Sequence, residues 1–202
     1  MIIVGLTGSI AMGKSEAGKI FRSLGVPVFD SDAEVHQLYS RGGAAVAPIG
    51  KLFPGVIVKG AVDREILSRV ILKNPQALKL LESIIHPLVR KGQDEFLNEC
   101  RIAGAEMAVL DIPLLFETDR ENEVDVVVVV SAPPEIQRVR VLQRPGMTAE
   151  KFDQILARQL PDAQKRAKAD FVVDTSQSIY HTAAQFRAIV AKLLKRQAES
   201  GS

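Results

Sequence analysis

The sequence predicts an α/β fold of three layers, in which helices cover both faces of a five-stranded parallel sheet. Apolar runs of strand length recur along the 202 residues, and each ends at a polar residue or at a glycine-rich loop. Such runs are typical of strands buried on both faces, and the helical patterns between them supply the crossovers. The predicted strands are Met1–Thr7, Val26–Phe29, Met107–Leu110, Val124–Val130 and Phe171–Val173.

The first predicted strand leads into Gly8–Ser15, which fits the phosphate-binding pattern G-x-x-x-x-G-K-[ST] at every fixed position. Gly8 and Gly13 leave backbone N–H groups free to surround phosphate oxygens at a helix N-terminus, where the dipole favours anions. Lys14 then reaches the β- and γ-phosphates, and the Ser15 hydroxyl can bind Mg²⁺. The helix is indicated by the apolar stripe Ala17, Ile20, Phe21 and Leu24. The segment therefore predicts a site for a nucleoside triphosphate.

The chain is predicted to form a single domain over residues 1–202, with one sheet core that two long segments interrupt. We expect the core to comprise residues 1–30, 104–133 and 170–198, with a last helix over about Ile179–Gln197. A length near 200 residues is enough for one substantial core with insertions.

The two interrupting segments have different characters. Residues 31–103 carry helical patterns without a strong strand signal, and they are predicted to form a helical insertion that holds an acceptor substrate. Residues 134–169 are helical and rich in arginine, with breaks at Pro145-Gly146 and at Pro161. We expect this second segment to form a hairpin lid.

Composition excludes several classes of partner. The net charge is only +2, and the absence of Trp with only two Tyr argues against a surface that stacks nucleic-acid bases. The longest valine run, Val126–Val130, is too short to cross a membrane. The single cysteine, Cys100, excludes an internal disulfide and is consistent with a reducing compartment. The sequence therefore predicts a cytoplasmic protein without a nucleic-acid, membrane or obligate protein partner.

The motifs narrow the class of phosphate-loop protein. The guanine-reading pattern N-K-x-D and the switch pattern D-x-x-G of GTPases are both absent, which favours a small-molecule kinase. Such a kinase needs a carboxylate near the acceptor hydroxyl and cations that close over the phosphates. Asp30 and Asp32 follow the second strand, and Asp32 could take the proton of an acceptor. Helix capping by Asp30 or Ser31, with Asp32 in the first turn, explains the same residues, so both interpretations stay open.

The predicted lid supplies the cations. We expect two of its arginines to contact phosphate, and a hairpin could bring Arg144 and Arg158 onto one side. The five candidates are Arg138, Arg140, Arg144, Arg158 and Arg166. In the insertion, His86 precedes Pro87 and is predicted to open a helix, either as a local cap or as a substrate contact.

Taken together, the motifs resemble those of the dephospho-CoA kinase family over nearly the whole chain. They occur in the family's order and include the strings Ile-His-Pro and Asp-Ile-Pro-Leu-Leu-Phe-Glu, which are far more specific than the phosphate loop. The matching segments are Ile3–Ile10, Gly13–Ser15, Asp30–Asp32, Val62–Arg64, Ile85–Arg90, Asp111–Glu117, Gln143-Arg144, Ile155–Gln159 and Ala169–Asp174.

The resemblance implies an enzyme that transfers the ATP γ-phosphate to the ribose 3′-hydroxyl of dephospho-CoA, the last step of CoA synthesis, with Mg²⁺. It implies that Asp32 is the base, that Lys14 lies on the transferring phosphate and Ser15 on the metal, and that Arg144 and Arg158 act from the lid. Arg64 and His86 would hold the acceptor, and Asp111 would orient metal-bound water or the acceptor. The residues expected around ATP are Gly8, Ala11, Met12, Gly13, Lys14, Ser15 and Glu16.

Three positions depart from the family's usual pattern. Ala11 replaces a frequent glycine, Glu16 brings a negative charge towards the α-phosphate, and Thr175 replaces an asparagine on the adenine side. The competing hypotheses are another small-molecule or nucleoside monophosphate kinase, and a nucleotide-binding regulatory module without turnover.

Overall fold

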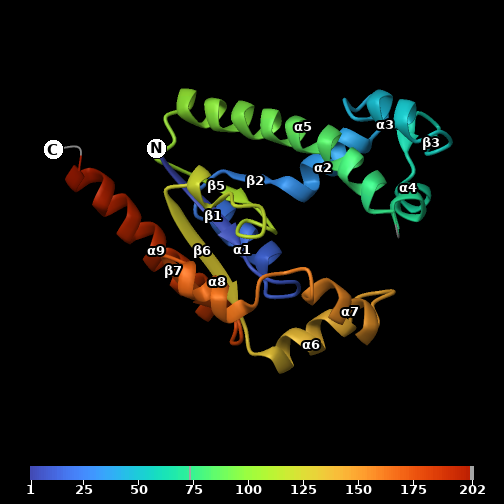
Figure 1. Ribbon diagram of the computed structural model, residues 1–202. Coiled ribbons are helices and arrows are strands. Elements are labelled where there is room, and N and C mark those ends of the chain that lie inside the picture. The colour runs from blue at the N-terminus through green and yellow to red at the C-terminus, as the bar shows by residue number, and fades with distance from the viewer. Residues whose placement is uncertain (73, 201–202) are drawn as a thin grey trace. The chain divides into compact units, whose positions relative to one another are not determined.

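The computed structural model of the protein describes residues 1–72 and 74–200 (Figure 1). Contacts between residues divide the chain into two compact units. The first comprises Met1–Phe29 and Cys100–Ser202, and the second comprises Asp30–Glu99.

The first unit is built, as predicted, on a five-stranded parallel sheet. Its strand order is β2-β5-β1-β6-β7. The central strand β1 pairs with β5 on one side, where Val4 lies beside Val109, and with β6 on the other, where Val4 lies beside Val126. The strands are β1 (Ile2–Thr7), β2 (Val28–Asp30), β5 (Met107–Asp111), β6 (Val126–Ser131) and β7 (Phe171–Asp174). The carboxyl ends of these parallel strands meet at one edge of the sheet, where ligands bind in such folds.

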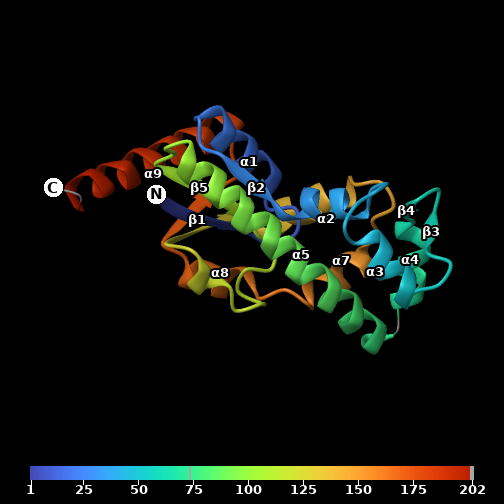
Figure 2. The ribbon, with the colours of Figure 1, turned by 90° about the horizontal axis from the view of Figure 1, so that it is seen from above.

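Helices cover both faces of this sheet and complete its core. Figure 2 shows α1 (Lys14–Ser23) and α9 (Ile179–Ser200) on one side of the strands and α8 (Asp162–Lys168) on the other. The ring centroids of Phe21 on α1 and Phe186 on α9 lie 4.9 Å apart in an edge-on arrangement, and both side chains are fully buried. Full burial of such a side chain stabilises the fold by about 1.5–3 kcal/mol, so this contact holds the last turn of α1 against α9.

The predicted lid segment is helical, with its breaks where the sequence predicts them. In Figure 1, α6 (Pro134–Leu142) and α7 (Ala149–Leu156) lie side by side, with the Pro145-Gly146 break in the connection between them. The side chain of Thr148 accepts a hydrogen bond from the Lys151 N–H and caps α7. Pro161 precedes α8, which packs against β6. A short 3-10 helix, η1 (Glu121–Glu123), lies between β5 and β6.

The second unit is mainly helical, but it also contains a short hairpin that the sequence did not predict. Its strands have only two residues each, too few to show an alternating pattern. Lys59 and Gly60 form the turn with φ angles of 51° and 82°, the left-handed conformation that tight hairpin turns require. The elements are α2 (Ser31–Tyr39), α3 (Val46–Leu52), β3 (Ile57–Val58), β4 (Ala61–Val62), α4 (Arg64–Ile71) and most of α5 (Pro75–Ile102).

The prediction that His86 opens a helix is wrong. His86 lies in the middle of α5, which has 28 residues and contains Pro87 in its interior. Proline inside a helix removes a hydrogen bond and costs about 3 kcal/mol. For this reason the sequence His86-Pro87 was interpreted as the start of a helix. Burial of one side of the helix outweighs this cost, because each large apolar side chain contributes about 1.5–3 kcal/mol. The buried apolar side chains on this side of α5 are Leu81, Ile85, Val89 and Leu97.

The long helices α5 and α9 are amphipathic rather than uniformly apolar. Within residues 1–72 and 74–200, no helix has both the length and the apolar character that crossing a membrane requires. The valine run Val126–Val130 lies in β6 and is almost wholly buried in the sheet.

Candidate functional site

The loop between β1 and α1 is shaped by its glycines. A Cβ atom on Gly8 would lie 2.6 Å from Val130 Cγ2 and 2.7 Å from the Val130 carbonyl oxygen, so no larger residue fits against β6. Gly13 precedes α1 with a φ of 95°, and none of the side chains that the structure describes caps the helix. The backbone N–H groups of the first turn of α1 are therefore left for an anion, which is the arrangement that binds phosphate.

Ala11 occupies a conformation that usually requires glycine. Its φ is 61°, in the left-handed region, which costs an L-residue about 1–2 kcal/mol. The side chain is nevertheless buried in a small apolar cluster with Val141 of α6 and Phe152 of α7. This departure from the usual glycine therefore does not prevent the loop from forming, because packing against the lid segment holds the strained residue.

Thr175 connects the loop to the ends of two strands. It is 5% exposed, and its hydroxyl lies 2.9 Å from the carbonyl oxygen of Met12 and 3.2 Å from that of Ser131. Arg140 of α6 donates to the Thr175 hydroxyl at 3.1 Å and to its carbonyl oxygen at 2.6 Å. The sequence suggested only an altered contact on the adenine side. In the structure, the Thr175 hydroxyl binds the backbone of the phosphate loop at Met12.

Two glutamines to which the sequence analysis gave no role hold Ile10. The Gln137 side chain donates to the Ile10 carbonyl oxygen at 2.8 Å, and the Gln159 side chain accepts from the Ile10 N–H at 3.0 Å. Gln137 lies one helical turn before the buried Val141 on α6. A polar residue on the apolar side of an amphipathic helix was the available signal.

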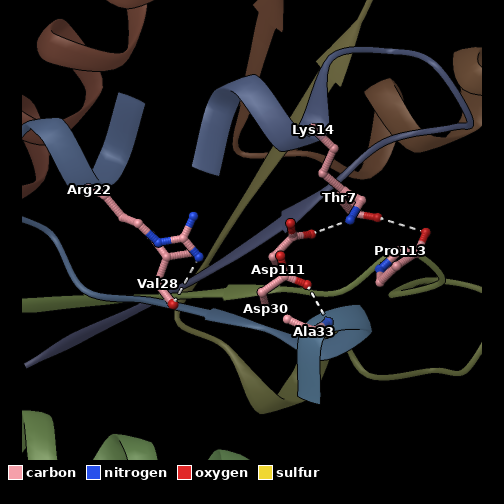
Figure 3. Close-up of polar contacts among 8 residues, drawn as sticks. All are labelled: Thr7, Lys14, Arg22, Val28, Asp30, Ala33, Asp111 and Pro113. Carbon is pink, nitrogen blue, oxygen red and sulfur yellow. Dashed lines mark hydrogen bonds and ion pairs between the residues drawn. The ribbon is translucent and has the colours of Figure 1, made fainter. Parts of the chain in front are cut away.

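Lys14 forms an ion pair with Asp111, which lies at the end of β5 (Figure 3). The Lys14 side chain is 17% exposed and that of Asp111 is 6% exposed. Both charges are thus largely removed from water, where pairing offsets the cost of desolvation. The contact directs the Lys14 ammonium towards the carboxyl edge of the sheet.

The other two charged or polar positions at the start of α1 face solvent. Ser15 is exposed in the first turn, so a ligand can reach its side chain. Glu16 is also exposed, and its carboxylate lies 2.6 Å from the ammonium of Lys19. This pairing partly offsets the negative charge that the sequence analysis expected near the α-phosphate.

In the second unit, the structure separates the roles of Asp30 and Asp32. The Asp30 carboxylate accepts from the Ala33 N–H at 3.0 Å and is the cap of α2 (Figure 3). Asp32 lies exposed in the first turn of α2, and no hydrogen bond or ion pair engages its carboxylate within the described residues. Helix capping therefore accounts for Asp30 and leaves the Asp32 carboxylate available.

The two residues predicted to hold the acceptor also lie in the second unit. Arg64 is the exposed first residue of α4, directly after the Asp63 cap, and His86 is exposed on α5. Burial raises the pKa of the Tyr39 hydroxyl, and the positive charge of Arg64 partly opposes this effect. Arg64 therefore lies within electrostatic reach of Tyr39.

The lid arginines come from different elements of the lid segment. Arg144 lies exposed in the break before α7 and Arg158 lies exposed just after it, so they are at opposite ends of that helix. Its eight residues correspond to about 12 Å along the axis. Arg138 lies 3.9 Å from the Asp153 carboxylate, and Arg166 lines a cavity of about 490 Å³ beside β7.

Glu117 has a structural contact that the sequence analysis did not assign. One of its carboxylate oxygens accepts from the Leu160 N–H at 2.7 Å and lies 2.8 Å from the ammonium of Lys165, a fully buried residue. Because an uncompensated buried charge is costly, this pair ties the end of the lid segment to the loop after β5.

Replacing Ala11 with glycine should stabilise the protein. Glycine adopts a positive φ without strain, so we expect Ala11→Gly to raise the free energy of unfolding by about 1 kcal/mol in urea titrations. Ala17→Gly is the matched control, because Ala17 is buried within α1 and glycine there should lower the same quantity by about 1 kcal/mol. Destabilisation by both substitutions would contradict the strain at Ala11.

Comparison with known proteins agrees with this geometry. A family model described as dephospho-CoA kinase matches residues 2–181. The dephospho-CoA kinase of Rhizobium meliloti is 57% identical over 193 residues, covering 96% of this chain and 98% of that protein. A crystal structure of a Thermus thermophilus protein superimposes with a TM-score of 0.83 at 34% identity, covering 95% of this chain and 97% of the other.

The dephospho-CoA kinase of Campylobacter jejuni superimposes with a TM-score of 0.65 at 25% identity, covering 95% of this chain and 96% of that one. The similarity thus includes the phosphate loop, the second unit and the lid segment rather than the loop alone. The chain belongs to the dephospho-CoA kinase family.

Proposed function

We propose that this protein transfers the γ-phosphate of ATP to the 3′-hydroxyl of the ribose of dephospho-CoA, giving CoA and ADP in the last step of CoA biosynthesis. The observation that carries the proposal is the phosphate loop with an uncapped helix N-terminus, in a chain that matches this family over nearly its whole length. In this proposal, the sheet core binds ATP and residues 31–103 bind the acceptor.

The loop and Lys14 form the donor side. Backbone N–H groups at the start of α1 bind the phosphates, and the Lys14 ammonium neutralises charge on the transferring group. In the structure Lys14 is paired with Asp111, which holds its ammonium group at the end of β5. The Lys14 side chain has therefore lost part of its conformational freedom before ATP binds, which lowers the entropy cost of binding.

The donor set is suited to magnesium. The Ser15 hydroxyl and the Asp111 carboxylate are oxygen ligands of the kind that Mg²⁺ takes, alongside phosphate oxygens and water. When bound, the ion neutralises charge on the β- and γ-phosphates. Asp111 would help to hold the ion while it is paired with Lys14, from its buried position at the end of β5.

Asp32 is assigned the role of base on the acceptor side. The ribose 3′-oxygen attacks the γ-phosphorus, the bond between that phosphorus and the oxygen bridging to the β-phosphate breaks, and ADP leaves with the bond's electron pair. The proton of the hydroxyl passes to the Asp32 carboxylate. Because Asp30 already caps α2, this carboxylate is not needed to hold the helix together.

The activity itself is tested with the purified chain, ATP, Mg²⁺ and dephospho-CoA. We expect equal amounts of CoA and ADP to appear, separated by chromatography, and no comparable turnover with nucleoside monophosphates as acceptors. Phosphorylation of another alcohol in place of dephospho-CoA would contradict the proposal and favour a different small-molecule kinase. Binding of ATP without any turnover would favour a regulatory module.

Asp32→Asn should lower kcat by about 10²–10⁴-fold with little change in the KM for ATP, because the amide cannot accept the proton. Asp30→Asn is the matched control: it removes the same charge two residues earlier but keeps a side chain that caps helices well. We expect near-normal kcat for this control in steady-state assays. Equal kcat values for Asp32→Asn and the unmodified enzyme would exclude the base role.

Arg144→Ala and Arg158→Ala should each lower kcat by about 10–10³-fold while weakening ATP binding much less, because their charge acts mainly as the phosphoryl group transfers. Arg138→Ala, on the same hairpin and also exposed, provides the control and should stay close to normal. Single-turnover rates and equilibrium binding of ATP separate the two effects. Normal kinetics for both variants would show that other arginines serve the lid.

A further inference from the structure

The Ile10 backbone is held from both sides by side chains of the lid segment. Gln137, on α6, binds the Ile10 carbonyl oxygen at 2.8 Å. Gln159, which follows α7, binds the Ile10 N–H at 3.0 Å. Both glutamines lie more than a hundred residues away from the loop in the sequence, so these bonds are long-range restraints on one short segment.

The two bonds have opposite polarity. Gln137 acts as a donor through its amide nitrogen, whereas Gln159 acts as an acceptor through its amide oxygen. Gln137 is 5% exposed, so water cannot readily replace it at the Ile10 carbonyl. A partly buried carbonyl that loses its donor carries an unfavourable desolvation energy, and the loop would change shape to recover a partner.

The position of these bonds matters because of the next residue. The Ile10 carbonyl belongs to the peptide unit that joins Ile10 to Ala11, and Ala11 has a strained φ of 61°. Strained backbone persists only where the surrounding structure over-determines it. Rotation of this peptide unit would relieve the strain, and the N–H groups that follow would no longer converge on phosphate. The bond to Gln137 opposes this rotation directly.

Packing adds to the restraint on the same segment. Ile10 and Ala11 contact a small apolar cluster contributed by α6, by α7 and by the connection between them, separate from the main core. The other members of the cluster are Val141, Met147, Phe152 and Leu156. The lid segment therefore holds both the side chains and the backbone of the loop's central residues.

We propose that Gln137 and Gln159 are positioning residues for nucleotide binding, which fix the Ile10 peptide so that the loop keeps its phosphate-binding shape despite the alanine at position 11. This inference rests on the proposed function, since it concerns the ATP site of that reaction. The glutamines act through the loop and do not contact the reacting atoms. The lid segment is thereby part of the nucleotide site before any nucleotide is bound.

The polarity of the bonds provides a test with internal controls. Gln137→Glu and Gln159→Glu add the same negative charge in the same region, but only the first replaces a required donor with an acceptor. We expect Gln137→Glu to raise the Kd for ADP about tenfold relative to Gln159→Glu, because it removes the hydrogen bond to the partly buried Ile10 carbonyl. Isothermal titration calorimetry with ADP measures this, and thermal melting of each apo variant reports folding.

Gln159→Leu completes the design, because it removes the acceptor without adding charge. This variant should bind ADP more weakly than Gln159→Glu, and it tests the inference even if Gln137→Glu does not fold. In steady-state assays the KM for ATP should rise with much less change in kcat. In the double variant with Ala11→Gly and Gln137→Glu, part of the affinity for ADP should return. Glycine at position 11 removes the backbone strain that drives the peptide unit to rotate when Gln137 no longer holds it.

The outcomes separate the two proposals. If the unmodified chain does not bind ADP, the proposed function fails and this inference fails with it. If the unmodified chain binds ADP but Gln137→Glu, Gln159→Glu and Gln159→Leu bind it equally well, only the inference is overturned. Lower melting temperatures with unchanged Kd values would likewise overturn it, since they would indicate a purely structural role.

Discussion

The loop between β1 and α1 has no ladder of hydrogen bonds of its own, so its shape depends on contacts from the elements around it. Gly8 allows it to approach β6 closely, and Thr175 binds the Met12 carbonyl from the end of β7. Gln137 and Gln159 bind Ile10 from the lid segment. The hydrogen bonds among these contacts pair backbone groups of Ile10 and Met12 with side chains from other elements. The sheet, the last strand and the lid segment are all needed to form one phosphate-binding loop.

The two halves of the proposed reaction are carried by different compact units. The loop, Lys14 and Asp111 belong to the unit with the parallel sheet, whereas Asp32 belongs to Asp30–Glu99. The chain passes directly from β2 into α2, and the Asp30 carboxylate caps that helix. A single residue thus ends the strand and starts the helix, which leaves the next acidic side chain, Asp32, unengaged and exposed in the first turn.

Much of the fold could be predicted because its signals are local. Buried strands appear as unbroken apolar runs, and the helix breaks at Pro145-Gly146 and Pro161 follow from the backbone limits of proline and glycine. The hairpin of β3 and β4 escaped prediction because its strands are too short for a pattern. His86 was misplaced because long-range packing of α5 outweighs the local cost of Pro87.

By itself, the sequence determined the parallel sheet, the phosphate loop and the family, because these depend on residue type at short spacing. Only the tertiary structure decided how Ala11 keeps a positive φ, why Thr175 is buried and what Gln137 and Gln159 bind. It also separated the capping role of Asp30 from the exposed carboxylate of Asp32. The physical reason is that a hydrogen bond between distant segments depends on distance and direction, which no spacing along the chain encodes.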